Sequence, residues 1–183
     1  MDRPEIRIAG TGVALREWTA EDLRAMVEIF DDPEVAYRTP VASPFDLDTA
    51  GAYLQKIQQA RADGTRIHLA ITVENGKPCG EVLLNLTRGS IGYTVAAAFR
   101  GQGLARRAAT LMTDYAHQVI GMTQVRAEIE PGNHASIAVA EGLGYRPSGE
   151  EPVQVNDGRR SYTLGTWVHE IPGTANEAIA AGR

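Results

Sequence analysis

The chain has 183 residues, of which 43% are hydrophobic and 22% are charged, and its formal net charge is −5. This length suits a single domain with one hydrophobic core, and the composition excludes a disordered or fibrous protein. The acidic balance argues against nucleic acid as a ligand, because such proteins need a basic face that neutralises phosphates.

Targeting features and cysteine content point to a cytoplasmic protein. The sequence has no run of about 18 apolar residues that could span a membrane, and residues 1–10 lack the basic-then-apolar pattern of a signal peptide. Cys79 is the single cysteine, so no disulfide can form within the chain, which agrees with a reducing compartment. We expect Cys79 to be a small buried residue of a strand.

The first expected elements are two short strands and a helix. Alternating apolar residues at 6–8 and 13–15 predict the strands. Thr19 and Asp22 resemble a capping box, which predicts the start of a helix, and Pro33 marks its end.

A second helix and a β-hairpin follow. The helix is capped within Ser43–Asp48 and stops at Gly64, after which the apolar residues alternate from 67 to 73 as in a strand. The turn Glu74-Asn75-Gly76-Lys77 contains Asn-Gly, so residues 79–86 should return as an antiparallel neighbour. The apolar face of the helix is expected to consist of Leu47, Ala50, Leu54 and Ile57.

The second half of the chain alternates strands with helices. Residues 91–97 and 124–130 predict strands, and the apolar stripe of residues 104–119 predicts a helix between them. Asn133 caps a short helix, and the last strand lies near 161–168.

These elements together predict an α+β fold, with a mainly antiparallel, twisted sheet and helices on its faces. We expect one domain over residues 1–183, with its core at about 13–168 and a flexible tail at 171–183.

The junction between the strand at 91–97 and the following helix carries the chemistry. The loop Arg100-Gly101-Gln102-Gly103-Leu104-Ala105 runs directly into the helix, whose first N–H groups lack intrahelical partners and attract anions. Glycines let the backbone approach an anion closely, and Arg106 and Arg107 add positive charge beside Arg100. The junction therefore predicts a site for a phosphorylated ligand.

Two common nucleotide motifs do not fit this loop. A P-loop needs Gly-Lys-Ser/Thr, and the dinucleotide motif needs a third glycine where this chain has Arg106. The alternative interpretation is that Gly101 and Gly103 only form a tight connection beside solvated arginines.

The sequence resembles the GNAT acetyltransferase superfamily in three segments that follow the family's order. The defined positions of the family's cofactor motif, Gln/Arg-x-x-Gly-x-Gly/Ala, are filled here by Arg100, Gly103 and Ala105. Residues 91–95 look like the family's strand before that loop, and 133–136 with 144–145 look like its Asn-x-x-Ser and Gly-Phe/Tyr segments. The similarity looks closest to the RimJ/RimL type, which acetylates protein amino termini, especially of ribosomal proteins.

The resemblance implies that acetyl-CoA lies between two splayed strands, here 91–97 and 124–130. Backbone groups near Tyr93 and Val95 would hold the pantetheine arm and the thioester carbonyl, with one N–H stabilising the developing negative charge. Transfer in the family goes directly from thioester to amine, so no enzyme nucleophile is needed. The residues expected at the cofactor are Tyr93, Val95, Arg100, Gly101, Gln102, Gly103, Leu104, Ala105, Asn133 and Ser136, with capping as the alternative role of Asn133.

Direct transfer needs a base for the ammonium and a hydrogen-bond donor for the leaving thiolate. Glu128 is the first candidate for the base, because it lies on the polar face of its strand, five residues before Asn133, where related enzymes place a glutamate. The alternatives are Glu81, water, and a purely exposed role for Glu128. Ser136 matches the serine that assists the thiolate in the RimJ/RimL type.

Two positions depart from the family pattern. Ala140 stands where many relatives carry a tyrosine donor, and Ser90 stands where they often carry glutamate. A CoA-binding regulatory module without catalysis therefore stays open as an alternative.

The acceptor is less well defined by the sequence than the donor. We expect a protein N-terminal α-amine, with a small amine such as an antibiotic or polyamine as the alternative. No metal is expected, because no pair of histidines has ligand spacing supported by other ligands, and the histidines are assigned structural or surface roles. No nucleic-acid or membrane partner is expected, and the oligomeric state is left open, with a homodimer as one option.

Overall fold

The computed structural model of the chain describes residues 4–73 and 76–171. Glu74 and Asn75 of the expected turn Glu74-Asn75-Gly76-Lys77, and residues 172–183 of the expected tail, lie outside the described residues. Within the described ranges, no helix is long and apolar enough to cross a membrane.

The strands confirm a mainly antiparallel sheet. They are β1 (Arg7–Gly10), β2 (Val13–Glu17), β3 (Arg66–Thr72), β4 (Pro78–Asn85), β5 (Ser90–Val95), β6 (Gln124–Ile129), β7 (Arg146–Pro147), β8 (Val153–Asn156) and β9 (Ser161–Glu170). They join in the order β1-β2-β3-β4-β5-β6-β9-β7, and β8 pairs with β9. Among these described strands, β5 and β6 form the one parallel pair.

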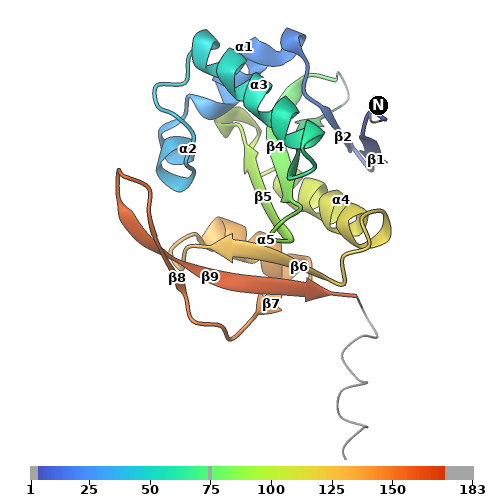
Figure 1. Cartoon of the computed structure of the whole chain (residues 1–183), viewed down its shortest axis with the longest axis vertical. Coiled ribbons are helices and arrows are strands. Elements are labelled where there is room, and N and C mark those ends of the chain that lie inside the picture. The colour runs from blue at the N-terminus through green and yellow to red at the C-terminus, as the bar shows by residue number, and fades with distance from the viewer. Residues whose placement is uncertain (1–3, 74–75, 172–183) are drawn as a thin grey trace, which may run out of the picture.

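Helices cover both faces of the sheet (Figure 1). They are α1 (Leu23–Phe30), α2 (Pro33–Arg38), α3 (Leu47–Ala62), α4 (Leu104–Gln118) and α5 (His134–Gly142), with 3₁₀ turns at Ala20–Asp22 and Ala97–Phe99. Phe30 and Leu54 belong to a core on the side of α1 and α3, whereas Leu104 and Met112 belong to a second core on the side of α4. The expected α+β layering is therefore confirmed.

The boundaries of the first helices agree with the expectation at Thr19–Asp22 and differ from it at Asp32-Pro33. The capping box of Thr19 and Asp22 is present as expected. Asp32-Pro33, however, starts a further helix, α2, instead of only ending α1, because the Asp32 carboxylate accepts from Glu34 N (2.9 Å) and Val35 N (3.0 Å). Proline at the first helical position loses no helical hydrogen bond, since that N–H has no partner in any helix.

The apolar face of α3 is shorter than expected. Ala50, Leu54 and Ile57 are buried, but Leu47 is 52% exposed, so its inclusion in that face was wrong. The reason is its place at the first residue of the helix, directly after the N-cap Asp46 and beyond the edge of the core.

Candidate active site

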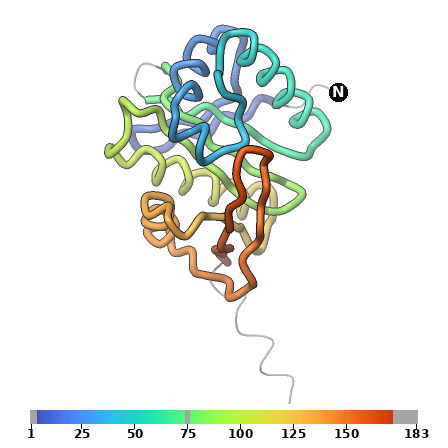
Figure 2. The backbone as a smooth tube through the Cα atoms, turned by 90° about the vertical axis from the view of Figure 1, so that its left-hand side faces the viewer, coloured from blue at the N-terminus to red at the C-terminus, as the bar shows by residue number. Residues whose placement is uncertain are grey.

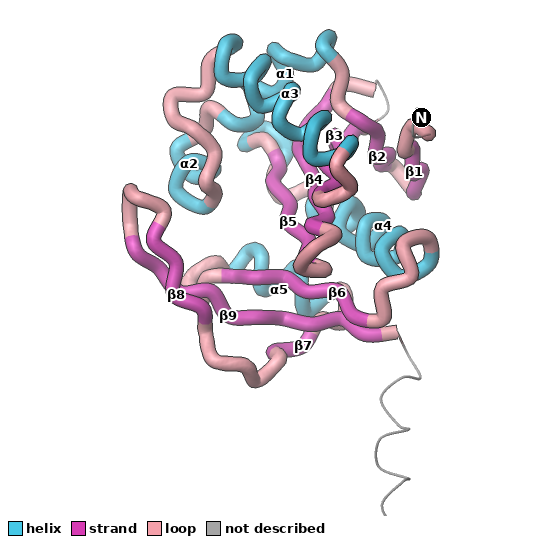
Figure 3. Tube along the Cα trace, in the orientation of Figure 1, coloured by secondary structure: helices cyan, strands magenta, loops and turns pink. Residues whose placement is uncertain are grey.

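The strands β5 and β6 pair briefly and then separate, as expected (Figure 3). Within the described residues, the two strands pair only at Ser90 with Arg126 and at Ile91 with Ala127. Gly89 O accepts from Arg126 N at 2.8 Å, so the carbonyl of Gly89 faces β6. Because backbone groups alternate along a strand, those of Tyr93 and Val95 face the same side, beyond the end of this pairing.

A cavity of about 550 Å³ lies at this separation. One wall consists of α3 and the segment 38–42, and the other consists of β3, β4, β5 and β6 with the start of α5. Its volume lies within the range of small-molecule sites, which runs from about 300 to 1,000 Å³.

Two carboxylates line the cavity from the two sides of β5. Glu81 lies on β4 opposite Thr94, and Glu128 lies on β6. Ala127 and Ile129 pack into the core on the α4 side, so Glu128 points to the opposite face, as alternation along a strand requires. Glu128 forms a 3.5 Å ion pair with Arg88, and its side chain is 28% exposed.

Glu81 belongs to a buried polar cluster with Tyr53 and His68. Its Oε1 accepts from the Tyr53 hydroxyl at 2.7 Å and lies 3.2 Å from His68 Nδ1. Burial raises the pKa of Tyr53 well above its ordinary value, and the neighbouring Glu81 adds to the effect. Among the described residues, Oε2 of Glu81 is a buried oxygen without a hydrogen-bond partner, although the residue lines the cavity.

The expectation that His68 has a structural or surface role missed its place in this cluster. His68 lines the cavity beside Glu81, with only 6% of its side chain exposed. The alternation of His68 out of the apolar face of its strand was the available signal. The register, which pairs His68 with Leu83 and Ala70 with Glu81, then places His68 beside Glu81.

Asn133 and Ser136 meet Tyr93 at the start of α5. Asn133 Oδ1 accepts from Ser136 N at 3.2 Å, which confirms the cap. The Tyr93 hydroxyl donates to Ser136 O at 3.1 Å, and burial raises the pKa of Tyr93 to about 12. Both Asn133 and Ser136 line the cavity, and the backbone of Ser136 is held at its N–H by Asn133 and at its carbonyl by Tyr93.

The loop before α4 has the form expected of an anion site. Gly101 (φ 77°) and Gly103 (φ 71°) adopt left-handed backbone conformations, and a Cβ added at either position would meet no atom within 4 Å. Leu104 is buried and anchors the helix, whose first backbone bond runs from Arg107 N to Gly103 O at 3.1 Å. The exposed loop backbone therefore leaves room for a phosphate at the helix start.

Two arginines of this loop make contacts within the protein. Arg100 donates to Val95 O (3.2 Å) and to Asp32 (3.1 Å), because the acidic start of α2 lies next to the loop. Arg106 donates to Gly142 O at 2.9 Å. A contact of Arg100 with phosphate thus stays a prediction that would require it to leave Asp32.

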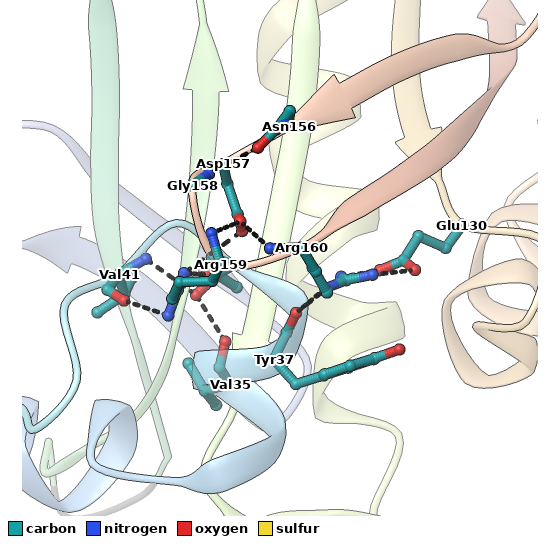
Figure 4. Close-up of polar contacts among 10 residues, drawn as sticks. Val35, Tyr37, Val41, Glu130, Asn156, Asp157, Gly158, Arg159 and Arg160 are labelled. Atoms are coloured by element: carbon teal, nitrogen blue, oxygen red, sulfur yellow. Dashed lines mark hydrogen bonds and ion pairs between the residues drawn. The ribbon is translucent and has the colours of Figure 1, made fainter.

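The tip of the β8–β9 hairpin lies beside α2 and the segment that follows it, as Figures 2 and 4 show. Arg160 donates to both oxygens of Glu130 (2.8 and 2.5 Å) and to Tyr37 O (2.7 Å), and its guanidinium lies over the Tyr37 ring. Arg159 donates to Thr39 O at 2.7 Å. We call Arg159 and Arg160 with these contacts the hairpin clamp. It fixes the segment 38–42, which lines the cavity.

Comparison with known proteins agrees with this geometry. Residues 13–146 match the family described as Acetyltransferase (GNAT) domain. The chain belongs to this family. It is therefore an acetyl-CoA-dependent acetyltransferase, with the cavity and the loop before α4 as its candidate active site.

Three relatives illustrate the range of similarity. The uncharacterized N-acetyltransferase p20 of Bacillus licheniformis is 24% identical over 143 residues, which are 75% of this chain and 80% of p20. The ribosomal-protein-S5-alanine acetyltransferase of Vibrio fischeri has a TM-score of 0.71 at 18% identity and covers 88% of this chain and 95% of its own. The RimL ribosomal L7/L12 α-N-protein acetyltransferase, solved with coenzyme A, has a TM-score of 0.75 at 14% identity, with 91% and 98% covered. These solved structures show the shared fold.

Proposed function

We propose that this GNAT acetyltransferase acetylates the α-amino group of a protein or peptide N terminus. The observation that carries the proposal is the cavity at the separation of β5 and β6, which carries Glu81 and Glu128 on the face beneath α3. An amine entering there meets carboxylates on both sides of β5. The RimL and Vibrio fischeri structures are both of ribosomal-protein acetyltransferases, which supports this acceptor class.

Acetyl-CoA, when bound, supplies the acetyl group as a thioester. The N–H groups of residues 101–105 would hold its pyrophosphate, because they lie at the start of α4, where residues 101–103 are exposed. The backbone groups of Tyr93 and Val95 would hold the pantetheine arm, and Val95 O would exchange its present bond from Arg100. Asn133 and Ser136 would border the same arm from α5.

Glu128 acts as the proposed general base for the acceptor ammonium, directly or through water. An α-amine has a pKa of about 7.7–8.0, so most of it is protonated at neutral pH and a nearby carboxylate assists the removal of its proton. The Ser136 hydroxyl donates to the sulfur as the thiolate leaves. The products are the acetylated amine and the free CoA thiol.

Glu81 is the second candidate for the base. Its buried Oε2, which has no hydrogen-bond partner in the described part of the chain, favours it, since a buried acceptor oxygen without a donor is costly. An ammonium group at this position would supply the missing donor. The contacts from Tyr53 and His68 would hold the carboxylate in place.

The deciding experiment measures release of the CoA thiol with matched peptides. One peptide has a free amino terminus and no lysine, a second has its amino terminus blocked but contains lysine, and a third group consists of small amines. We expect turnover with the first peptide. Turnover confined to the small amines would replace the proposal with the small-molecule alternative, which the volume of the cavity also accommodates.

A further inference from the structure

The helix α3 presents a second face to the cavity, next to its buried apolar face. This face consists of residues three or four positions apart, which therefore form one stripe along the helix. The residues of the stripe that line the cavity are Thr49, Ala52, Tyr53, Lys56 and Ala60. Small side chains dominate it, so its two large polar members, Tyr53 and Lys56, determine what a ligand meets on this wall.

Some charged side chains around the cavity form ion pairs and others do not. Arg38 pairs with Glu130 at 3.5 Å, and Glu128 pairs with Arg88 at the same distance. Lys56 and Arg66 also line the cavity and are exposed, but the ion pairs of the described residues include no carboxylate for either of them. Lys56 and Arg66 therefore outnumber Glu81, the one carboxylate of the cavity lining without an arginine or lysine partner among the described residues, in a chain whose net charge is −5.

The register of β3 and β4 places these charges relative to Glu81. Arg66 pairs with Asn85, and Ala70 pairs with Glu81, so Arg66 and Glu81 occupy the same face of the sheet. Arg66 and Ala70 are four residue steps apart along β3, which corresponds to about 13 Å. The charge of Arg66 nevertheless reaches the Tyr53 hydroxyl, where it opposes the pKa rise caused by burial.

We propose that Lys56 and Arg66 bind a carboxylate of the acceptor, so that the enzyme selects peptide amino termini with acidic side chains close to the amine. This inference rests on the proposed function. Along the strand direction, an amine between Glu81 and Glu128 lies about 10–13 Å from Arg66, and an extended peptide spans about 3.3–3.6 Å per residue. Two or three such steps cover about 7–10 Å and the acidic side chain covers the rest, so this side chain belongs to the third or fourth residue of the acceptor.

The test uses peptides of one length that carry Glu, Gln or Lys at the third and fourth positions. We expect kcat/KM to be about tenfold higher for the Glu peptide than for the Gln peptide, because charges at the rim of a site act mainly on encounter and binding. The advantage should shrink with added salt. In the double variant Lys56→Gln/Arg66→Gln, kcat/KM should become equal for the Glu and Gln peptides. The cause should be a higher KM for the Glu peptide, with kcat unchanged.

The matched control removes the same number of positive charges elsewhere. Arg24 on α1 and Lys77, which pairs with Glu28 at 2.9 Å, are exposed and lie outside the lining of the cavity. Arg24→Gln/Lys77→Gln should keep the preference for the Glu peptide. Loss of the preference in this control as well would assign the effect to net charge and overturn the site.

Equilibrium binding separates this inference from the proposed function. Titration of the same peptides into the protein saturated with CoA measures the charge preference without turnover. Equal binding of the Glu and Gln peptides overturns the inference even where peptides are acetylated. Preference for small amines that carry a carboxylate, lost in the Lys56 and Arg66 variant, supports the charge site but rejects the peptide as its source.

Discussion

The Tyr53 hydroxyl donates a 2.7 Å hydrogen bond to Oε1 of Glu81 and thereby ties the middle of α3 to β4. The two residues are 28 positions apart in the sequence. Both side chains line the cavity, so this bond fixes the distance between the helical wall and the sheet.

We predict that Tyr53→Phe lowers the free energy of unfolding by about 1–3 kcal/mol, the usual cost of leaving a buried polar group without its partner. The ring and its packing stay, so the loss reports the hydroxyl alone. Urea denaturation at pH 7 measures it. Tyr37→Phe is the control, since Tyr37 is 53% exposed, and a shift there as large as that of Tyr53→Phe would contradict the importance of the buried bond.

The loop before α4 gives a second prediction. Gly103 has a φ of 71°, so a substitution to glutamate would strain the backbone by about 1–2 kcal/mol. Asn and Asp tolerate this conformation better than other side chains and differ from each other mainly in charge. Gly103→Asp should therefore bind acetyl-CoA at least about tenfold more weakly than Gly103→Asn.

Isothermal titration measures both affinities, and thermal unfolding without ligand checks that the two variants are equally folded. Equal acetyl-CoA affinity of the two variants would place the pyrophosphate away from this helix start.

Local features of the site were predictable from the sequence, whereas its long-range contacts were not. The Asn133 cap and the glycine turn before α4 depend on residues a few positions apart, and each has a conformational reason visible in the sequence. The splay of β5 and β6 came from the family resemblance.

The buried cluster depends instead on the β3–β4 register and on how α3 rotates about its axis. Tyr53, His68 and Glu81 meet only because Ala70 pairs with Glu81 and because the cavity-lining face of α3, which includes Tyr53, lies toward the sheet. No local pattern specifies either relationship. Arg100 illustrates the same limit, since its partner Asp32 is 68 residues away.

The hairpin clamp gives a pH-dependent prediction. Hydrogen bonds from Arg160 hold the pKa of Glu130 below its ordinary value and outweigh the opposing effect of burial. A carboxyl whose pKa is lower in the folded than in the unfolded state adds stability above its unfolded pKa of about 4.3, and this stability is lost as the pH falls through the folded pKa. Glu130→Gln should therefore be less stable than the parent at pH 7. Its free energy of unfolding should also fall less than that of the parent when the pH is lowered.

Urea denaturation of both proteins from pH 7 to pH 3 measures the difference. Arg160→Lys should also be less stable than the parent at pH 7 and lose less stability on acidification. Lysine keeps the charge but lacks the planar guanidinium that contacts both oxygens of Glu130. Parallel pH curves for the parent and Glu130→Gln would show that this ion pair contributes nothing to the pH dependence.

The last prediction concerns proton removal and thiolate departure. Glu128→Gln should lower kcat/KM by about 10²–10⁴-fold with little change in acetyl-CoA affinity, the usual effect of removing a general base. The deficit should shrink as the pH rises, because a larger fraction of the acceptor amine is then already neutral. Ser136→Ala should cost about tenfold, equivalent to about 1.4 kcal/mol for one hydrogen bond made mainly in the transition state. Glu141→Gln, which removes an exposed carboxylate of α5 outside the lining of the cavity, is the control and should retain activity. Full activity of Glu128→Gln at neutral pH, together with a pH-dependent loss in Glu81→Gln, would transfer the role of base to Glu81 and leave Glu128 as the partner of Arg88.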